Sequence, residues 1–464
     1  MSVAPAADLK IAFYGDDFTG ATDTLATAAQ AGLRTLLFLG LPGAAQIAGA
    51  GPLDCLGIAG AARAMTPAEM ENELEPVGRL FAALGAPVIH YKTCSTFDSG
   101  AAIGSIGAAL RILRRHVRNP LLPIVGGQPN LRRYCLFGNL FAGVGNAGPV
   151  SRIDRHPTMR SHPVTPMHEA NLALHFASQG LAQVASFDYT AYAETDAAQN
   201  ARLDALLALR PDAVLMDVGQ ADHLAAVGRL IWRHAQRAPL LAAGASSVVQ
   251  ALAAHWHQQR RALPGIAAAD GPVLVLAGSL SPVTALQVAA AQSYVKVAID
   301  AARLVQDAQY AGGLANRLAT LLRAGRHVLA CTTDDAGQAE DHAMGHAEGH
   351  AEDHALGHAE PAAFTVQAPR QLAIACGRLL AAVLKQAPLK RIGIAGGDTS
   401  SHAVQALDAW GLSYHAQLAP GVALCRLHSV DAALDGMEIM LKGGQMGSDD
   451  VFERLLHGVN RTAP

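Results

Sequence analysis

The chain has 464 residues, of which 51% are hydrophobic and 16% are charged, and its formal net charge at neutral pH is −3. A chain of this length exceeds what one hydrophobic core usually supports, so two domains are expected. The composition excludes a disordered chain, and the charge balance offers no basic surface for nucleic acid. We therefore expect a globular protein that does not bind DNA or RNA.

The six cysteines are widely spaced and form no C-x-x-C pair. This spacing argues against zinc ribbons and disulfide scaffolds, and it favours a reducing compartment. Residues 1–10 lack the charged-then-apolar pattern of a secretory signal, and the sequence has no unbroken apolar stretch of about 18 residues. The expectation is a cytoplasmic protein without membrane attachment.

The most informative segment is IAFYGDDFTGATDT, residues 11–24. Its apolar run 11–14 predicts a buried strand that leads into a helix. The paired acids Asp16 and Asp17 follow the strand, where open α/β sheets bind their ligands. The spacing imitates a phosphate-binding loop, but Ala21 replaces the lysine and two acids would repel a phosphate. Acids here suit proton abstraction, hydroxyl binding or a metal. The alternative is a capped turn in which either Asp only satisfies helix N–H groups.

Short apolar runs alternate with helical patterns along the chain, which is typical of mostly parallel sheets flanked by helices. Strands are expected at 11–14, 35–39, 55–59, 87–91, 122–126, 183–187, 213–217, 273–277, 294–299, 327–331, 391–395, 423–427 and 437–441. A segment rich in Pro and Gly near 258–272 marks a break between two halves. We expect an α/β fold of two domains, residues 8–258 and 272–464, each with a mostly parallel sheet flanked by helices.

Residues 335–361 contain a low-complexity insert in which histidine recurs every four residues from His342 to His358. If helical, these histidines would form one stripe able to bind Zn²⁺ or Ni²⁺. The repeat is short and has little to bury, so a solvated expansion of a surface loop is the favoured interpretation.

Three glycine-rich junctions in the second half each follow an apolar run and precede a helix: VLAGSLSP (275–282), IGIAGGDTSS (392–401) and MLKGGQMG (440–447). Glycine lets the backbone approach an anion, and helix N-termini carry a partial positive charge. In the first junction Ser281 suits the N-cap and Pro282 the first helical position. Three such loops on one parallel sheet can converge on one nucleotide. The chain has no G-x-G-x-x-G turn, which disfavours a dehydrogenase.

Polar residues in the first half suggest where a small acid binds. Lys92, at the end of an expected strand, can meet a carboxylate or a transferred phosphoryl group, although strand-end lysines often only snorkel to solvent. The same segment offers three further groups that can bind ligand hydroxyls: Ser95, Thr96 and Asp98.

A second polar segment, residues 154–167, is held extended by its prolines. Its His162 and Thr165 can contact a ligand, although a lone histidine is more often structural. Arg63 is a candidate carboxylate clamp, because a guanidinium group matches a carboxylate bidentately.

The motifs GDDFTGATDT, YKTCSTFDS, SHPVTPM, AGSLSPVT, AGGDTSS and LKGGQMG occur in an order that resembles the four-carbon acid sugar kinases over nearly the whole chain. The resemblance implies an N-terminal sugar-acid-binding domain, a C-terminal nucleotide-binding domain and an active site in the cleft between the domains. It also implies ATP as phosphoryl donor, Mg²⁺ as its counter-ion, and a tetronate-type substrate that is phosphorylated on its terminal hydroxyl.

Carried over by position, the resemblance implies ATP contacts at Ala277, Gly278, Ser279, Ser281, Gly396, Gly397, Asp398, Thr399 and Gly444. Family members often have serine at position 277, so only a backbone contact is expected there. Asp398 stands where some relatives have glutamate, which keeps a carboxylate for Mg²⁺. The CSTFDS motif resembles the 3-oxo-tetronate kinase branch more than the D-threonate branch. The histidine-rich insert is not part of the family pattern.

The expected function is ATP-dependent phosphorylation of a four-carbon sugar acid, with Asp17, or else Asp16, orienting and deprotonating the attacking hydroxyl. Two alternatives stay open. One is a kinase for a different small hydroxy acid, and the other is a sensor that binds nucleotide and sugar acid without chemistry. The expected partners are the sugar acid and ATP, and a homo-oligomer is compatible with the sequence.

Overall fold

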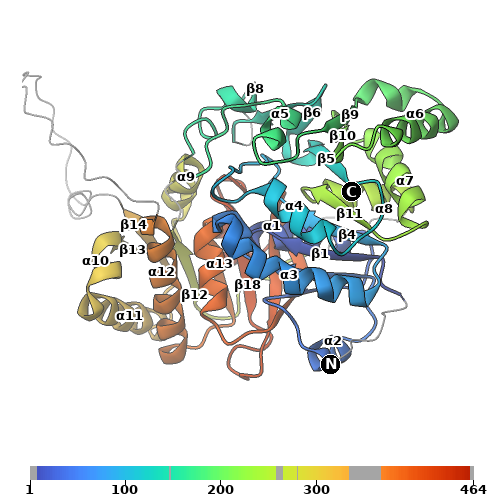
Figure 1. Ribbon diagram of the computed structural model, residues 1–464. Coiled ribbons are helices and arrows are strands. Elements are labelled where there is room, and N and C mark those ends of the chain that lie inside the picture. Colours follow the sequence, from blue (N-terminus) through green and yellow to red (C-terminus); the bar gives the residue numbers. More distant parts are fainter. Residues whose placement is uncertain are drawn as a thin grey trace, which may run out of the picture.

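The structure is a computed structural model that describes residues 8–145, 148–162, 164–257, 265–278, 281–333 and 367–459. The histidine-rich insert expected at 335–361 lies outside the described residues. Strands and helices alternate along the chain, and the two halves of the sequence lie side by side (Figure 1). Within the described ranges, no helix combines the length and the apolar character needed to cross a membrane.

The strands are β1 (Ile11–Gly15), β2 (Thr35–Phe38), β3 (Cys55–Ala59), β4 (Val88–Lys92), β5 (Pro123–Gln128), β6 (Arg133–Leu136), β7 (Asn139–Gly143), β8 (Val150–Arg152), β9 (Val184–Phe187), β10 (Ala213–Asp217), β11 (Leu240–Gly244), β12 (Val273–Ala277), β13 (Val295–Asp300), β14 (Val328–Thr333), β15 (Arg391–Ala395), β16 (Gly411–Ala419), β17 (Val422–His428) and β18 (Glu438–Lys442).

The α-helices are α1 (Phe18–Gln30), α2 (Ala44–Gly49), α3 (Pro67–Leu84), α4 (Ile106–Arg114), α5 (Leu172–Ala177), α6 (Asp196–Ala208), α7 (His223–Ala235), α8 (Ser247–His255), α9 (Pro282–Ala290), α10 (Ala301–Gln306), α11 (Ala308–Arg323), α12 (Gln367–Gln386), α13 (Gly397–Gln405) and α14 (Val451–His457). Short 3₁₀ helices are η1 (Ala62–Ala64), η2 (Pro129–Leu131), η3 (Ile153–Arg155) and η4 (Tyr189–Ala193).

The 18 strands of the described chain belong to one sheet. In the N-terminal half, parallel strands lie in the order β2-β3-β1-β4-β11-β5-β10-β9. In the C-terminal half, parallel strands lie in the order β13-β14-β12-β15-β18, and β17 and β16 continue the sheet in antiparallel fashion. The expected α/β fold with mostly parallel sheets flanked by helices is confirmed.

One antiparallel contact joins the sheets of the two halves. Strand β16 pairs with β2, so that Gly411 lies opposite Phe38 and Leu412 lies opposite Leu37. Both leucines are fully buried. The sequence predicted a sheet in each half but not this junction, because β16 was not among the expected strands. The small antiparallel extension β6-β7-β8, which continues from β5, was also not expected.

The hydrophobic core is continuous beneath both halves. One buried cluster contains side chains of α1, α7 and α8 together with side chains of α11, α12 and α13. A second cluster lies between the N-terminal sheet and the helices α3 and α4. The carboxyl ends of parallel strands in both halves are therefore held at fixed positions by one packed layer.

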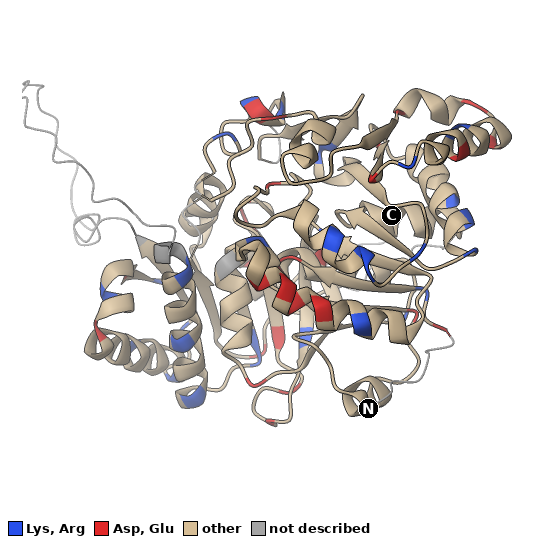
Figure 2. Cartoon of the chain, viewed as in Figure 1, with Lys and Arg blue, Asp and Glu red and all other residues tan. Residues whose placement is uncertain are grey.

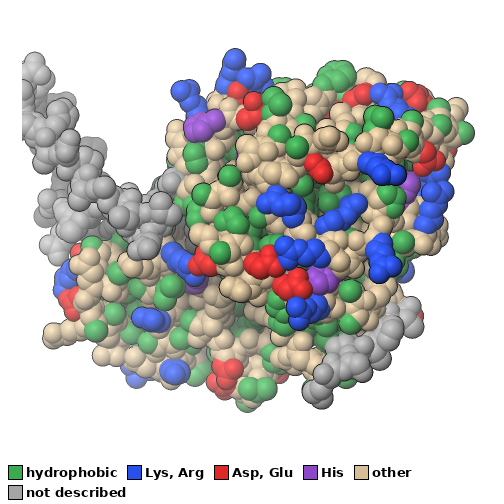
Figure 3. Space-filling view, viewed as in Figure 1, with side chains coloured by type: hydrophobic (Ala, Val, Ile, Leu, Met, Phe, Trp, Pro, Cys, Tyr) green, Lys and Arg blue, Asp and Glu red, His purple; other side chains and the backbone are tan. Residues whose placement is uncertain are grey.

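Ion pairs fasten α3 to the end of α4 at the surface. Helix α3 carries acidic side chains along one side (Figure 2). Glu71 pairs with Arg115, and Glu75 lies 3.0 Å from both Arg79 and His116. On this face of the molecule, basic and acidic side chains lie next to one another (Figure 3). His116 and the neighbouring Arg115 thus have acidic partners within the same chain.

The contact between α7 and α8 depends on a glycine, and this makes the packing testable. A Cβ added to Gly228 of α7 would lie 1.9 Å from the carbonyl oxygen of Ala251 in α8. We expect Gly228→Ala to lower the free energy of unfolding by about 1–3 kcal/mol, because backbone cannot yield as a side chain can. Gly312→Ala in α11 meets nothing within 4 Å and should stabilise by about 0.5–1 kcal/mol. Denaturant unfolding of both variants measures their free energies of unfolding. Equal free energies for the two variants would contradict the proposed packing of α7 against α8.

Candidate functional site

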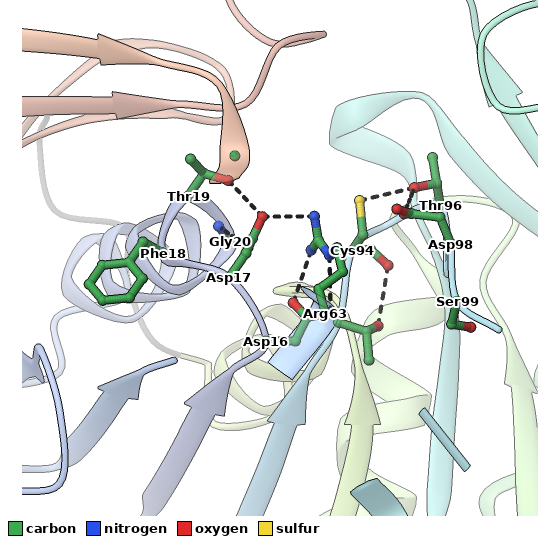
Figure 4. Close-up of polar contacts among 12 residues, drawn as sticks. Asp16, Asp17, Phe18, Thr19, Gly20, Arg63, Cys94, Thr96, Asp98 and Ser99 are labelled. Carbon is green, nitrogen blue, oxygen red and sulfur yellow. Dashed lines mark hydrogen bonds and ion pairs between the residues drawn. The ribbon is translucent and has the colours of Figure 1, made fainter. Parts of the chain in front are cut away.

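Two carboxylates and one arginine form a buried cluster at the end of β1 (Figure 4). Nη2 of Arg63 lies 2.9 Å from Oδ1 of Asp16, and Nη1 of Arg63 lies 2.8 Å from Oδ2 of Asp17. Asp17 also caps α1, because its Oδ1 accepts the Gly20 N–H at 2.6 Å. Thr19 Oγ1 donates to the other oxygen of Asp17 at 2.9 Å. The capped turn considered from the sequence is therefore present, and an ion-paired arginine is added to it.

The two neighbouring carboxylates have different acidities. Burial raises the pKa of Asp16 above its ordinary value, and the attraction of Arg63 offsets only part of this effect. Burial acts on Asp17 in the same direction, but the charges of Arg63 and Lys92 and the hydrogen bonds from the first turn of α1 outweigh it. The pKa of Asp17 thus lies below its ordinary value, and this carboxylate is ionised at neutral pH.

Lys92 lies at the end of β4, next to β1, and only 3% of it is exposed. A Cβ added to Gly20 would lie 2.2 Å from Nζ of Lys92 and 2.4 Å from Oδ1 of Asp17. Position 20 therefore requires glycine if both charged groups are to keep their places. Among the described residues, Lys92 has no ion-pair partner at salt-bridge distance.

The two polar segments of the first half come together around Asp98. Its carboxylate accepts hydrogen bonds from Thr96 Oγ1 at 2.6 Å and from Thr165 Oγ1 at 3.3 Å. His162 Nδ1 accepts the backbone N–H of Thr165 at 3.1 Å. Burial opposes ionisation of Asp98, but the charge of Arg63, followed by that of His162, holds its pKa below the ordinary value. Ser95 is buried in the same loop.

The three glycine-rich junctions of the second half also meet. Ser281 Oγ and Thr284 Oγ1 donate to the carbonyl oxygen of Gly444 at 2.6 and 3.0 Å. A Cβ added to Gly278 would lie 2.2 Å from Thr399 Oγ1, so the first and second loops touch. Ser281 caps α9 and a proline follows it, as the sequence predicted.

Gly396 closes the second loop in a conformation that favours glycine. Its φ is +123°, and its N–H donates to the carbonyl of Lys442 at 2.9 Å. Helix α13 begins at the next residue, Gly397. Ser279 and the side chain of Asp398 lie outside the described part of the chain, so the expected contacts of these two residues stay predictions. Among the described residues, no group of three or more His, Cys, Asp or Glu side chains suits a metal ion.

Loops from the two halves of the chain meet at the start of α1. Oδ2 of Asp17 lies 3.6 Å from where a Cβ of Gly397 would be. The backbone N–H of Phe18 donates to Ser401 Oγ at 3.4 Å. Thr19 Oγ1 lies 3.9 Å from the Cβ position of Gly443. The acid pair of the first half therefore lies beside the glycine-rich loops of the second half.

Sequence reasoning did not single out Lys442 as a site residue. This lysine ends β18, is fully buried, and donates from Nζ to Thr284 Oγ1 at 3.1 Å. The ring centroid of Phe452 lies 5.9 Å from the ammonium nitrogen. Burial lowers the pKa of Lys442 to about 7. The sequence did contain a pattern that could have identified Lys442. It directly precedes Gly443 and Gly444 and lies at the end of a strand, as Lys92 does.

Arg133 was also not singled out. Its guanidinium donates to the carbonyls of Leu131 at 2.6 Å and Gly143 at 3.5 Å. Within the described chain it has no carboxylate partner, and its buried Nε makes no hydrogen bond. Burial lowers its pKa, whereas the nearby Cys94 thiol raises it slightly. Arg133 begins β6, a strand that was not expected from the sequence, so no pattern would have identified it.

Two family models match the two halves of the chain. Residues 11–252 match the family model described as "Sugar-binding N-terminal domain", and residues 274–452 match "Nucleotide-binding C-terminal domain". The chain thus combines a segment of a sugar-binding class with a segment of a nucleotide-binding class.

Relatives of nearly the same length carry kinase names. A 3-oxo-isoapionate kinase from Paraburkholderia graminis is 38% identical over 97% of this chain and 95% of its own. A 3-oxo-tetronate kinase from Methylobacterium radiotolerans is 30% identical over 97% of this chain and 99% of its own. The chain belongs to the four-carbon acid sugar kinase family and is a phosphotransferase that acts on an alcohol group.

Solved structures share the fold at lower identity. A chain from Salmonella typhimurium LT2 superposes with a TM-score of 0.72, is 23% identical, and covers 96% of this chain and 98% of its own. A Haemophilus influenzae protein gives a TM-score of 0.66 at 23% identity with the same coverage. At this identity the structures support the two-domain architecture alone.

The buried cluster predicts a pH-dependent loss of stability when its arginine is removed. Arg63→Met leaves Asp16 and Asp17 next to each other without their cation, which costs about 3–5 kcal/mol near pH 7.5. Arg63 supplies the largest attraction that lowers the pKa of each acid, so both folded-state pKa values rise relative to the wild type. The folded state therefore binds more protons, and the deficit shrinks as the pH falls towards 5.

Thermal unfolding at pH 5 and 7.5 measures this change, with Arg34→Met as the matched control. Arg34 pairs with Asp54 at the surface, where its side chain is 44% exposed. A deficit in Arg63→Met that is the same at both pH values would contradict the assignment.

Proposed function

We propose that this protein transfers the γ-phosphoryl group of ATP to the terminal hydroxyl of a four-carbon sugar acid, in the catabolism of carbohydrate acids. The observation that carries the proposal is the position of Asp17, whose carboxylate oxygen lies 3.6 Å from the Cβ position of Gly397. A group that can orient a hydroxyl thus lies at the N-terminus of a helix that can bind phosphate. Phosphoryl transfer requires this arrangement of acceptor and donor.

The second half has the features that a nucleotide phosphate chain requires. Helices α9 and α13 both begin at the glycine-rich loops, and a helix N-terminus offers backbone N–H groups to an anion. Gly278 and Gly396 have no side chain that would keep a phosphate group away from the backbone of these loops. We propose that these loops, with Ser281, Thr399 and Gly444, hold the phosphates, and that bound ATP supplies the phosphoryl group.

In this proposal Asp17 orients the attacking hydroxyl and accepts its proton. Its lowered pKa keeps it ionised, and its hydrogen bonds to the first turn of α1 fix the carboxylate. Arg63 is engaged by both acids through separate nitrogen atoms. We therefore propose that Arg63 positions the acid pair, rather than serving mainly as the clamp for a substrate carboxylate.

The substrate carboxylate is then assigned to Lys92 and Arg133, which form no ion pair at salt-bridge distance among the described residues, although the charge of Lys92 also acts on Asp17. The hydroxyl groups of the substrate are assigned to the hydrogen-bonded set around Asp98, which contains Thr96, Thr165 and His162. We also propose a domain boundary within 258–272, between the segments that match the two family models.

A second candidate substrate is 3-oxo-isoapionate. It is favoured by sequence identity, because the 3-oxo-isoapionate kinase is 38% identical to this chain and the 3-oxo-tetronate kinase is 30% identical. The deciding experiment is ADP release from MgATP with 3-oxo-tetronate, D-threonate, L-threonate, D-erythronate and 3-oxo-isoapionate. Turnover highest with a four-carbon acid supports the proposal, and turnover only with 3-oxo-isoapionate selects the second candidate. Binding of ATP without turnover of any acid would favour a sensor.

Replacing the proposed base should remove turnover without unfolding the protein. Asp17→Asn keeps the size of the side chain and one acceptor oxygen but cannot accept the proton. We expect kcat to fall by about 10²–10⁴-fold, with a smaller change in KM for ATP. Steady-state kinetics with the best acid of the panel measure this, and near-normal kcat in the variant would remove Asp17 from this role.

Gly20→Ala tests the geometry rather than the chemistry of the site. The added methyl group would displace Lys92 and Asp17, which lie 2.2 and 2.4 Å from the Cβ position. We expect kcat/KM to fall at least about tenfold. Gly312→Ala, where the methyl group meets nothing, is the matched control and should keep wild-type kinetics. Wild-type kinetics in Gly20→Ala would show that these positions are not needed for turnover.

A further inference from the structure

Lys442 is a buried cation for which the described chain provides no counter-charge. Its side chain is completely buried, and the hydroxyl oxygen of Thr284 is its hydrogen-bond acceptor, at 3.1 Å. An ammonium group carries three N–H donors. Burying such a group without a carboxylate is costly, so an unbalanced lysine in a packed interior calls for a functional explanation.

The surroundings of Lys442 suggest which anion it serves. Its backbone carbonyl accepts the N–H of Gly396, which opens α13, and Gly443 follows it in the chain. Thr284, its hydroxyl partner, also donates to the carbonyl of Gly444. The ammonium thus bonds to the Thr284 hydroxyl in the first turn of α9, and this hydroxyl in turn contacts the third glycine-rich loop at Gly444.

We propose that Lys442 supplies the positive charge that binds the phosphate chain of the nucleotide. The inference rests on the proposed nucleotide site and adds a residue to it. The loops alone offer N–H groups and helix termini, which amount to partial charges. A nucleotide phosphate chain carries several full negative charges, and a buried ammonium beside it would be attracted without competition from water.

The other charged groups around this corner are already engaged. On α14, which contributes Phe452, Glu453 lies 3.1 Å from His457 and Arg454 pairs with Asp450 at 2.8 Å. On the facing edge of the first half, Asp17 is held by Arg63. On α13 the titratable residues are Asp398, whose side chain lies outside the described residues, and His402 in the last turn, which is not an acid. Within the described chain, none of these acids is placed to neutralise Lys442.

The proposal predicts that nucleotide binding changes the protonation of Lys442 and therefore depends on pH. With a pKa of about 7, Lys442 is largely neutral above neutral pH in the free protein. A phosphate group beside it would raise that pKa, so nucleotide binding should take up a proton at pH 8 to 9. Affinity should then fall as the pH rises from 7 to 9, by up to about tenfold per pH unit.

The test is isothermal titration of the full-length protein with ADP in the presence of Mg²⁺. Lys442→Met has nearly the volume of lysine and lacks the charge, and we expect its affinity for ADP to fall at least tenfold. Its affinity for adenosine should stay within about twofold of wild type. Lys385→Met, which removes an exposed lysine of α12, is the matched control and should bind ADP normally.

A second measurement does not depend on the folding of a variant. For the wild-type protein at pH 8.5, the ADP binding enthalpy should depend on the ionisation enthalpy of the buffer in the sense of proton uptake. Adenosine should show no such dependence. If Lys442 has only a structural role, Lys442→Met should be less thermally stable but should bind ADP with unchanged affinity. The wild-type protein should then take up no proton on binding ADP. These two results together would overturn the inference.

Failure of the inference is distinguishable from failure of the proposed function. If the wild-type protein binds no ADP, the nucleotide site itself is wrong and both proposals fall. If it binds ADP and phosphorylates a sugar acid while Lys442→Met binds ADP equally tightly, only the role of Lys442 is rejected.

Discussion

The site depends on one guanidinium group between two carboxylates. Asp16 and Asp17 are adjacent in sequence and buried, so their mutual repulsion would drive one of them to protonate if they stood alone. Arg63 faces both acids with separate nitrogen atoms and permits Asp17 to stay charged. A charged Asp17 at the start of α1 then lies beside the first residue of α13. The contact between the two halves at Asp17 thus depends on the charge of Arg63, which offsets the charges of the two carboxylates.

Small residues complement this balance by allowing close approach. Gly20 leaves room for Lys92 beside Asp17, and Gly278 leaves room for Thr399. In both places a methyl group would displace a polar side chain. The parallel sheet brings the strand ends to one edge, and glycine allows the loops that follow to approach one another. Polar groups from distant parts of the sequence are therefore concentrated without bulky side chains between them.

Much of the fold could be predicted from the sequence, because buried parallel strands occur in it as short apolar runs such as 11–14 and 391–395. The loops were recognisable because glycine and helix-capping residues follow those runs. The pairing of Arg63 with both acids could not be predicted, since it depends on how η1 lies against β1. Lys442 was overlooked because a lysine at a strand end gives no sign of burial in its sequence neighbourhood. Strand β16 was missed because its partner β2 comes from the other half of the chain.

The pairing of β16 with β2 also bears on how ligands can enter and leave. In many two-domain enzymes the domains swing apart about a flexible linker. Here the edge strand of one half is hydrogen-bonded to the edge strand of the other, at Gly411–Phe38 and Leu412–Leu37. A wide rigid-body opening would break these bonds and expose the buried leucines to water. The pairing of β16 with β2 therefore opposes a wide rigid-body separation of the two halves.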